Sequence, residues 1–283
     1  MLGKASEKGS GGLATAKRSS VTTTEKSANG STDKSDRLNK SNKSSESNKS
    51  SNSNKSSKPN KLNAPKASNK KLVLRAAEIV DRLKSIYPDA VCALEFDGAP
   101  WKLMVMGRLS AQCTDKRVNE VCKILFEKFP TAEALAYGDI DEIREIVRPC
   151  GLFRVKSDDI KEECRMLVED FGGVLPDTMD ELLQFRGVGR KIANLLLGDI
   201  FHKGGIVADT HCIRICGRLG FYPEDVKDPL KTERIMSALM PPEEQSDFCH
   251  RIVTFGREYC KAQSPDCKSC PISELCASKS KRI

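Results

Sequence analysis

The chain of 283 residues has no apolar run long enough to span a bilayer and no charged-then-apolar leader at Met1, which argues against a membrane or secreted protein. Its formal net charge of +8 favours a polyanionic partner, but residues 1–71 carry sixteen Lys and Arg against five Asp and Glu. The remainder is therefore slightly acidic, and any affinity of that part for nucleic acid must come from locally arranged groups.

Residues 1–70 consist largely of Ser, Asn and Lys, as in SNKSSESNKSSNSNKSSKPNK, with almost no aromatic or branched apolar side chains. Such a segment buries too little apolar surface to offset the entropy of ordering, so we expect a disordered tail. The tail acts either as a solubilising leader or as a polycation that attracts DNA weakly and without sequence preference. We favour the attraction to DNA.

From Leu72 onward, apolar residues recur at the spacing of one helix face, and no long segment alternates with period two. The predicted helices start at Leu72, at a capping Asp115 and after Lys156, and they end at Tyr87-Pro88, Phe129-Pro130 and Gly172-Gly173. The best strand candidate is VCALEF, residues 91–96. The predicted fold class is therefore all-α.

The stretch LLQFRGVGRKIANLLLGD, residues 182–199, is apolar at both ends and has two glycines in its middle. The apolar residues at its ends belong to two helices, and Gly187-Val188-Gly189 turns tightly between them with positive backbone angles. This pattern is a helix-hairpin-helix. Gly187 and Gly189 leave backbone N–H groups uncovered at a helix N-terminus, beside Arg190, and such groups bind phosphate. The predicted partner is a nucleic-acid backbone.

Lys191 lies in the first turn of the second hairpin helix, where the helix dipole repels a cation. This position favours the neutral amine, which is a nucleophile. The other interpretation is a phosphate contact like that of Arg190, and the hairpin alone favours it.

Eighteen residues after Lys191, IVADTHCIRICGRLG places Asp209 as the N-cap of a helix that ends at Gly220. By itself Asp209 is a good cap.

The motif G-V-G-R-K followed by D-T-H at this distance resembles the helix-hairpin-helix DNA glycosylases, and specifically endonuclease III. In that family the lysine and the aspartate at the positions of Lys191 and Asp209 are catalytic. The resemblance also implies that Gln112, in RLSAQCTDKRVNEV, fills the space that a flipped base leaves. From the residues alone, Gln112 is a polar residue near a helix start.

Four cysteines near the end of the sequence lie within seventeen residues, in CKAQSPDCKSCPISELC. They are Cys260, Cys267, Cys270 and Cys276, with the spacing C-x6-C-x2-C-x5-C. So dense a set indicates a metal site. Zinc more usually binds paired Cys-x-x-Cys knuckles, whereas one compact, uneven loop suits a cubane with one ligand for each iron. The spacing also resembles the [4Fe–4S] loop of endonuclease III, so we favour an iron–sulfur cluster over zinc.

The resemblance runs from about residue 72 to residue 279 and implies a division of the chain. After the tail of residues 1–70, an N-terminal helix in residues 71–92 packs with the cluster domain. A six-helix barrel with the hairpin occupies residues 93–203, and an iron–sulfur cluster domain occupies residues 204–283. Where the family often has proline, threonine and valine, this chain has Arg186, Ile192 and Ala208.

The remaining histidines and cysteines are assigned to packing rather than to chemistry. The eight other cysteines are expected in the core, and Trp101, His202 and His250 are expected to be packing or surface residues. His211 follows Asp209 closely and either orients the aspartate or is a buried histidine with its hydrogen bonds made. We favour the buried histidine.

The residues together with the resemblance predict a bifunctional DNA N-glycosylase and AP lyase. The resemblance to endonuclease III implies oxidised or ring-damaged pyrimidines as substrates, in base-excision repair. Lys191 would attack C1′ of the deoxyribose and form a Schiff base, with help from Asp209, and β-elimination would then nick the strand. The predicted partner is double-stranded DNA with damaged bases or abasic sites. We expect a monomer without membrane contact, in the cytoplasm with the nucleoid, with the nucleus as second choice.

Two alternatives remain open at this point. A monofunctional glycosylase of the adenine-mismatch type would share the fold, the cluster and the aspartate, but it has no lysine at the position of Lys191. A non-enzymatic DNA-binding protein would use the hairpin and the tail to hold phosphates and would leave damaged duplexes intact.

Overall fold

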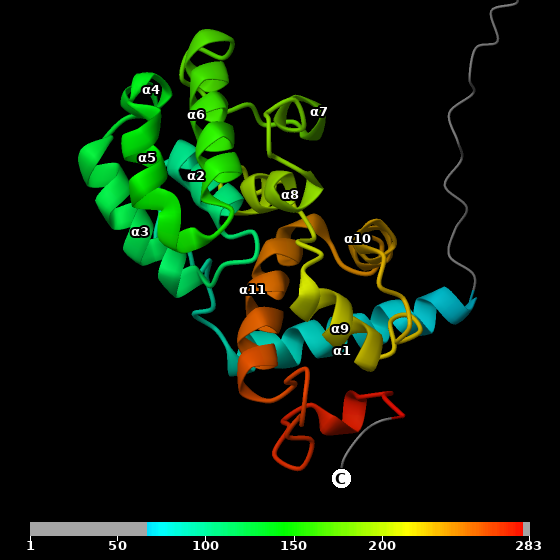
Figure 1. The fold of residues 1–283 in the computed structure, drawn as a ribbon. Coiled ribbons are helices and arrows are strands. Elements are labelled where there is room, and N and C mark those ends of the chain that lie inside the picture. Colours follow the sequence, from blue (N-terminus) through cyan, green and yellow to red (C-terminus); the bar gives the residue numbers. More distant parts are fainter. Residues whose placement is uncertain (1–66, 280–283) are drawn as a thin grey trace, which may run out of the picture. The chain divides into compact units, whose positions relative to one another are not determined.

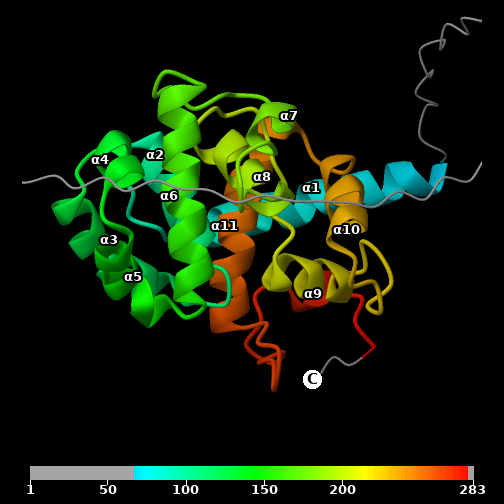
Figure 2. The same cartoon turned by 45° about the horizontal axis from the view of Figure 1, so that its top comes forward.

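The structure is a computed structural model that describes residues 67–279, and all regular secondary structure in this range is helical (Figures 1 and 2). The longer helices are α1 (Ala67–Ile86), α2 (Pro100–Leu109), α3 (Asp115–Lys128), α5 (Ile140–Val147), α6 (Phe153–Glu169), α8 (Arg190–Asp199), α9 (Thr210–Arg218), α10 (Pro229–Ser237) and α11 (Pro242–Glu258). The shorter ones are α4 (Ala132–Tyr137), η1 (Arg148–Cys150), α7 (Met179–Leu182) and η2 (Ser273–Leu275). The prediction of an all-α fold is confirmed for the described residues.

The helix that the sequence places at Leu72 begins earlier, at Ala67, and ends at Ile86 as expected before Pro88. Residues 67–70 were assigned to the tail and are the first residues of α1 instead. The rest of the predicted tail, residues 1–66, lies outside the described residues. None of the helices in residues 67–279 is both long and apolar enough to cross a membrane.

The predicted strand at residues 91–96 is wrong, because this segment is a non-helical connection between α1 and α2. Two of its backbone groups are paired with a side chain instead of a neighbouring strand. The Glu95 N–H donates to Asn119 Oδ1 at 3.2 Å, and Asn119 Nδ2 donates to the Ala93 carbonyl at 2.9 Å. Leu94 anchors the segment in the core with 6% exposure.

Helix boundaries shift by a few residues for local reasons. The N-cap of α3 is Thr114, whose hydroxyl accepts from the Arg117 N–H, so the predicted cap Asp115 is the first helical residue. Helix α6 begins three residues before Lys156, and Lys156 itself is fully buried. Its Nζ donates to the carbonyls of Leu109 and Cys150, each at 2.8 Å, so the charged end has partners inside the protein.

Two apolar cores hold the helices together. The first core takes its buried side chains from residues between Leu94 and Leu197, which include α2 to α8. The second core combines α1, from Ala76 to Leu83, with side chains between Ile206 and Ile272. The N-terminal helix is therefore packed with the C-terminal part of the described chain (Figure 1).

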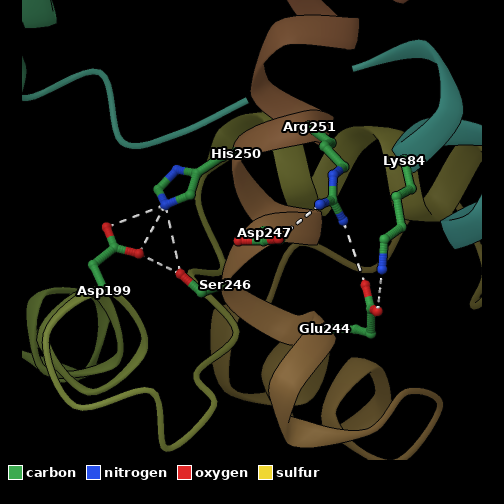
Figure 3. Close-up of polar contacts among 7 residues, drawn as sticks. All are labelled: Lys84, Asp199, Glu244, Ser246, Asp247, His250 and Arg251. Carbon is green, nitrogen blue, oxygen red and sulfur yellow. Dashed lines mark hydrogen bonds and ion pairs between the residues drawn. The ribbon is translucent and has the colours of Figure 1, made fainter. Parts of the chain in front are cut away.

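Helix α11 connects the two parts because it contacts α1, α9 and α8 (Figures 1 and 2). Arg251 of α11 is only 3% exposed and pairs with Asp247 at 2.6 Å and with Glu244 at 3.4 Å. Glu244 also binds Lys84 of α1 at 2.8 Å (Figure 3). These linked ion pairs hold α1 against α11 in addition to the apolar contacts.

Candidate functional site

A cleft of about 690 Å³ brings together residues that are far apart in the sequence. Its walls come from the α1–α2 connection, the turn between α2 and α3, the start of α8, the segment before α9, and α11. Lys191, Asp209 and Gln112 all line this cleft. Three of the residues that the sequence analysis singled out are thus on one concave surface.

Lys191 is the second residue of α8 and is exposed at the cleft. The N-cap of this helix is Gly189, which has no side chain to cap the first backbone N–H groups. Those N–H groups have no partner within the helix, so they remain available to an anion. The helix start therefore presents a lysine amine and uncovered backbone donors side by side.

Asp209 is the N-cap of α9, as predicted, and its Oδ1 accepts the Cys212 N–H at 2.7 Å. The segment before it is packed closely on α8. A Cβ atom on Gly205 would lie 2.4 Å from the Asn194 carbonyl oxygen, and Asn194 Nδ2 donates to the Ile206 carbonyl at 3.1 Å. These contacts hold the segment that leads to Asp209 against the helix that carries Lys191.

The hairpin turn needs glycine at one of its two glycine positions for backbone reasons. Gly187 has φ +85°, and a Cβ atom there would lie 2.8 Å from the Arg108 side chain. Gly189 has φ −97°, so the prediction of a positive angle at this residue is wrong. A Cβ atom at Gly189 would meet nothing within 4 Å, because this residue faces open space.

The arginines on either side of the turn are both engaged in ion pairs. Arg186 binds Asp159 at 2.8 Å, and Arg108 binds the same carboxylate at 2.6 Å. Arg190 pairs with Glu233 of α10, with its Nε donating to Oε2 at 3.0 Å. The predicted phosphate contact Arg190 therefore reaches a phosphate only by sharing or leaving its carboxylate partner.

Gln112 lies in the turn between α2 and α3, is exposed, and has φ +54°. A left-handed backbone is unusual for a residue with a side chain and costs roughly 1 kcal/mol. Leu152, in the turn before α6, has the same backbone region with φ +48° and is 61% exposed. The sequence analysis did not single out Leu152, and only its backbone angle together with its exposure marks it.

Two histidines line the cleft, and the sequence analysis missed one of them. His250, which was assigned to packing or surface, has Nε2 at 2.8 Å from Asp199 Oδ1, and its side chain is 13% exposed. His211 is half-buried, and its Nδ1 lies 3.3 Å from Arg214 Nη2. Burial lowers the pKa of His211, so its neutral form is favoured, with Arg214 and Arg257 acting in the same direction.

The four cysteines of the C-terminal loop surround one small cavity beside α9. Arg218 of α9 donates to Cys260 Sγ at 3.4 Å and to the Lys261 carbonyl at 2.7 Å, which holds the start of the loop. Burial raises the pKa of the Cys260 thiol, and Arg218 opposes this effect. The loop therefore gathers four thiols around one space and supplies a cation next to them.

The spacing of these thiols bears on the kind of metal that they fit. Among the residues that the structure describes, no three of the four sulfur atoms all lie within 4.8 Å of one another. A single tetrahedral zinc ion with Zn–S bonds of about 2.3 Å would require sulfur atoms about 3.8 Å apart. Four thiols around one cavity can bind a group with several metal ions, each held by one thiolate.

Comparison with known proteins agrees with this geometry. Residues 105–242 match the family model described as HhH-GPD superfamily base excision DNA repair protein. An endonuclease III from Synechocystis sp. is 42% identical over 214 residues, which cover 75% of this chain and 95% of the relative.

Two similar solved structures are a non-covalent endonuclease III–DNA complex and a trapped endonuclease III–DNA covalent intermediate, the estranged-adenine complex. Each is 39% identical, has a TM-score of 0.68, and matches 72% of this chain and 95% of its own chain. The predicted helix-hairpin-helix glycosylase fold is confirmed. The chain belongs to the endonuclease III family of the HhH-GPD superfamily, and it is a DNA glycosylase of base-excision repair.

Proposed function

We propose that the protein is a bifunctional DNA N-glycosylase and AP lyase that removes oxidised pyrimidines from double-stranded DNA. The observation that carries the proposal is that Lys191 and Asp209, at the starts of two different helices, line one cleft. A nucleophile and a carboxylate on one concave surface are the groups that this chemistry requires. A trapped covalent complex of a similar endonuclease III supports a covalent route.

In the first step, Asp209 accepts a proton from the Lys191 ammonium, and the free amine attacks C1′ of the deoxyribose. The C1′–N bond to lysine forms as the glycosidic bond breaks, and the departing base takes up the proton that Asp209 had accepted. Opening of the sugar ring gives a Schiff base. The cap hydrogen bond from the Cys212 N–H holds the Asp209 carboxylate in one orientation during this step.

In the second step, the imine acidifies the proton at C2′. Loss of that proton to a base drives the electron pair toward C3′ and expels the 3′ phosphate, so the strand is nicked by β-elimination. Water then hydrolyses the imine and regenerates Lys191. The enzyme needs no second nucleophile for this lyase reaction, because one amine serves both steps.

We assign the binding of the duplex to the hairpin and to the turn before α3. The uncovered N–H groups after Gly189 would bind one phosphate, with Arg190 as a second donor when it leaves Glu233. Gly187 would contribute the tight turn that exposes them, because the Val188 N–H itself donates to the Phe185 carbonyl at 3.1 Å. Gln112 would occupy the space of a base that has rotated into the cleft. Its exposure and its left-handed backbone at the cleft edge support this role.

For the C-terminal loop we propose a [4Fe–4S] cluster bound by Cys260, Cys267, Cys270 and Cys276. The grouping of these thiols around one cavity supports this assignment. When bound, the cluster would crosslink the loop through four thiolates. A brown protein that contains iron supports the cofactor, and a colourless protein that contains zinc would overturn it.

The decisive experiment is borohydride trapping on a duplex with one oxidised pyrimidine, with wild type, Lys191→Ala and Lys203→Ala compared side by side. Lys203 is an exposed lysine shortly after the same helix, so its variant controls for a general loss of positive charge. We expect a covalent adduct from wild type and Lys203→Ala and none from Lys191→Ala. Base release without an adduct would indicate a monofunctional glycosylase, and neither product would indicate a DNA-binding protein.

A further inference from the structure

A second cluster of reactive side chains lies on the cleft, apart from Lys191 and Asp209. Cys92 belongs to the α1–α2 connection, Asp199 ends α8, and His250 lies in the middle of α11. One donor atom from each lies within 4.8 Å of the other two. Within residues 67–279, this is the only set of three or more Cys, His, Asp or Glu residues that meets so closely.

The imidazole and the carboxylate of the cluster lie slightly closer together than two ligands of one zinc ion. His250 Nε2 lies 2.8 Å from Oδ1 and 3.1 Å from Oδ2 of Asp199 (Figure 3). A tetrahedral zinc ion with bonds of about 2.0–2.2 Å to nitrogen and oxygen would hold those atoms about 3.3 Å apart. The imidazole and the carboxylate would have to separate by about half an ångström to admit the ion.

The carboxylate of the cluster is held in place by a neighbour. The Ser246 hydroxyl, one turn before His250 on α11, donates to Asp199 Oδ1 (Figure 3). The side chains of Asp199 and His250 are only 9% and 13% exposed, so little rotational freedom remains for them. Ligands that are oriented by outer hydrogen bonds bind a metal with a smaller entropic cost.

The cluster is also accessible, because Cys92 and His250 both line the cleft. A metal ion could therefore reach the cluster from the cleft, and water could complete its coordination. Three protein ligands with one open position are a common arrangement for zinc in proteins. A buried hydrogen-bonded triad without such an opening would have no route for an ion.

We propose that Cys92, Asp199 and His250 form a zinc-binding site on the wall of the cleft. A thiolate and an imidazole select zinc over magnesium and calcium, which prefer oxygen ligands only. Binding forms Zn–S, Zn–N and Zn–O bonds and releases the Cys92 thiol proton to solvent. The ion would tie the α1–α2 connection to α8 and α11, and the site does not depend on the proposed role of Lys191.

The competing explanation is an ordinary His–Asp ion pair with a cysteine beside it. Both explanations account for the contacts between Asp199 and His250, but only a metal site requires the sulfur of Cys92. A serine at residue 92 would keep a hydrogen bond to Asp199 and would lose the thiolate ligand. This substitution therefore separates the two explanations.

The test uses the full chain as purified, with the iron content and visible absorption of the C-terminal loop recorded before and after each titration. After removal of loosely bound metal, Co²⁺ is added as a spectroscopic probe, and Zn²⁺ is then titrated in competition. Wild type is compared with Cys92→Ser, His250→Gln, Ser246→Ala and Cys113→Ser. Cys113 lines the same cleft but is not part of the cluster, so its variant controls for non-specific thiol binding.

We expect wild type and Cys113→Ser to bind one Co²⁺ with a thiolate-to-cobalt charge-transfer band that Zn²⁺ abolishes. Binding should be at least about 100-fold weaker in Cys92→Ser and His250→Gln, and about 10-fold weaker in Ser246→Ala. Zinc should also raise the Tm of wild type by about 2–4 °C and leave that of Cys92→Ser unchanged.

An unchanged cobalt spectrum in Cys92→Ser would overturn the proposal, and so would the absence of any binding by wild type. Far-ultraviolet circular dichroism and the Tm without metal show whether each variant is folded. If Cys92→Ser proves unfolded, the comparison of His250→Gln with Cys113→Ser decides the question on its own.

Discussion

The two apolar cores are assembled from the chain in different ways. The first core draws its buried side chains from a continuous stretch between Leu94 and Leu197, whereas the second joins α1 to residues after Ile206. Contacts between distant segments close longer loops and cost more entropy to form. Lys191 is on a helix of the first core, and Asp209 caps a helix of the second. The candidate site thus forms only when the first core, built from one continuous stretch, associates correctly with the second core, built from two distant segments.

The largest expected effect comes from Asp209→Asn, which tests the chemistry contributed by the second core without removing its helix cap. Asparagine is as good an N-cap as aspartate, so α9 should remain folded. We expect the single-turnover rate of base release to fall by about 10²- to 10⁴-fold. Asp228→Asn, at the N-cap of α10, is the matched control and should retain the wild-type rate. A rate for Asp209→Asn within threefold of wild type would remove Asp209 from the mechanism.

The second prediction separates the two cores by stability. Leu83 in α1 and Leu103 in α2 are both fully buried, one in each core. Leu83→Ala and Leu103→Ala should each lower the free energy of unfolding by about 2–5 kcal/mol. Only Leu83→Ala should also speed the loss of visible absorption from the C-terminal loop during denaturant unfolding, because α1 packs with that part of the chain. Equal loss from both variants would mean that the two cores unfold as one unit.

The third prediction concerns the hairpin turn on the first core. Gly187→Ala should lower the free energy of unfolding by about 1–2 kcal/mol, because alanine is strained at φ +85°. The new methyl group would also press on Arg108, which Asp159 holds. Gly189→Ala should cost only about 0.5 kcal/mol, since its backbone is ordinary and its surroundings are open. Urea unfolding of both variants gives the comparison, and the reverse order would contradict the backbone argument.

The smallest expected effect is a gain in stability from Glu163→Gln beneath the hairpin. Glu163 is fully buried, neither carboxylate oxygen has a hydrogen-bond partner, and burial raises its pKa well above the usual value despite the opposing charge of Arg108. As pH rises above about 4.3, the unfolded chain loses this proton while the folded chain keeps it, so wild type loses stability. Glu163→Gln removes that loss, and its advantage should grow with pH to about 1 kcal/mol at neutral pH.

The control for this titration is Glu162→Gln at the neighbouring position. Its hydrogen bond and ion pair with Arg165 lower the pKa of Glu162, so its stabilising effect is present above the unfolded pKa and is lost as pH falls. Glu162→Gln should therefore be slightly less stable than wild type at neutral pH. A pH-independent difference between Glu163→Gln and wild type in chemical denaturation would show that Glu163 is ionised in the folded protein.

Local patterns in the sequence were sufficient for most of the helices. The apolar spacing from Leu72, the stop at Pro88 and the cap at Asp209 act over a few residues, so they could be read directly. The strand predicted at residues 91–96 failed for a tertiary reason, because Asn119 from α3 pairs the backbone that a second strand would have paired. The cap of α3 was displaced by one residue because the Thr114 hydroxyl accepts the Arg117 N–H, and Asp115 instead binds Arg257 of α11.

The sequence by itself determined the all-α class, the hairpin, the Asp209 cap and the dense cysteine loop, because each depends on neighbours within about twenty residues. Only the tertiary structure decided that Lys191, Asp209 and Gln112 share one cleft, that Glu233 engages Arg190, and that Cys92 and His250 meet Asp199. These contacts join segments that are up to 158 residues apart. Their geometry follows from how the two cores pack against each other, and periodicity along a single segment carries no information about that packing.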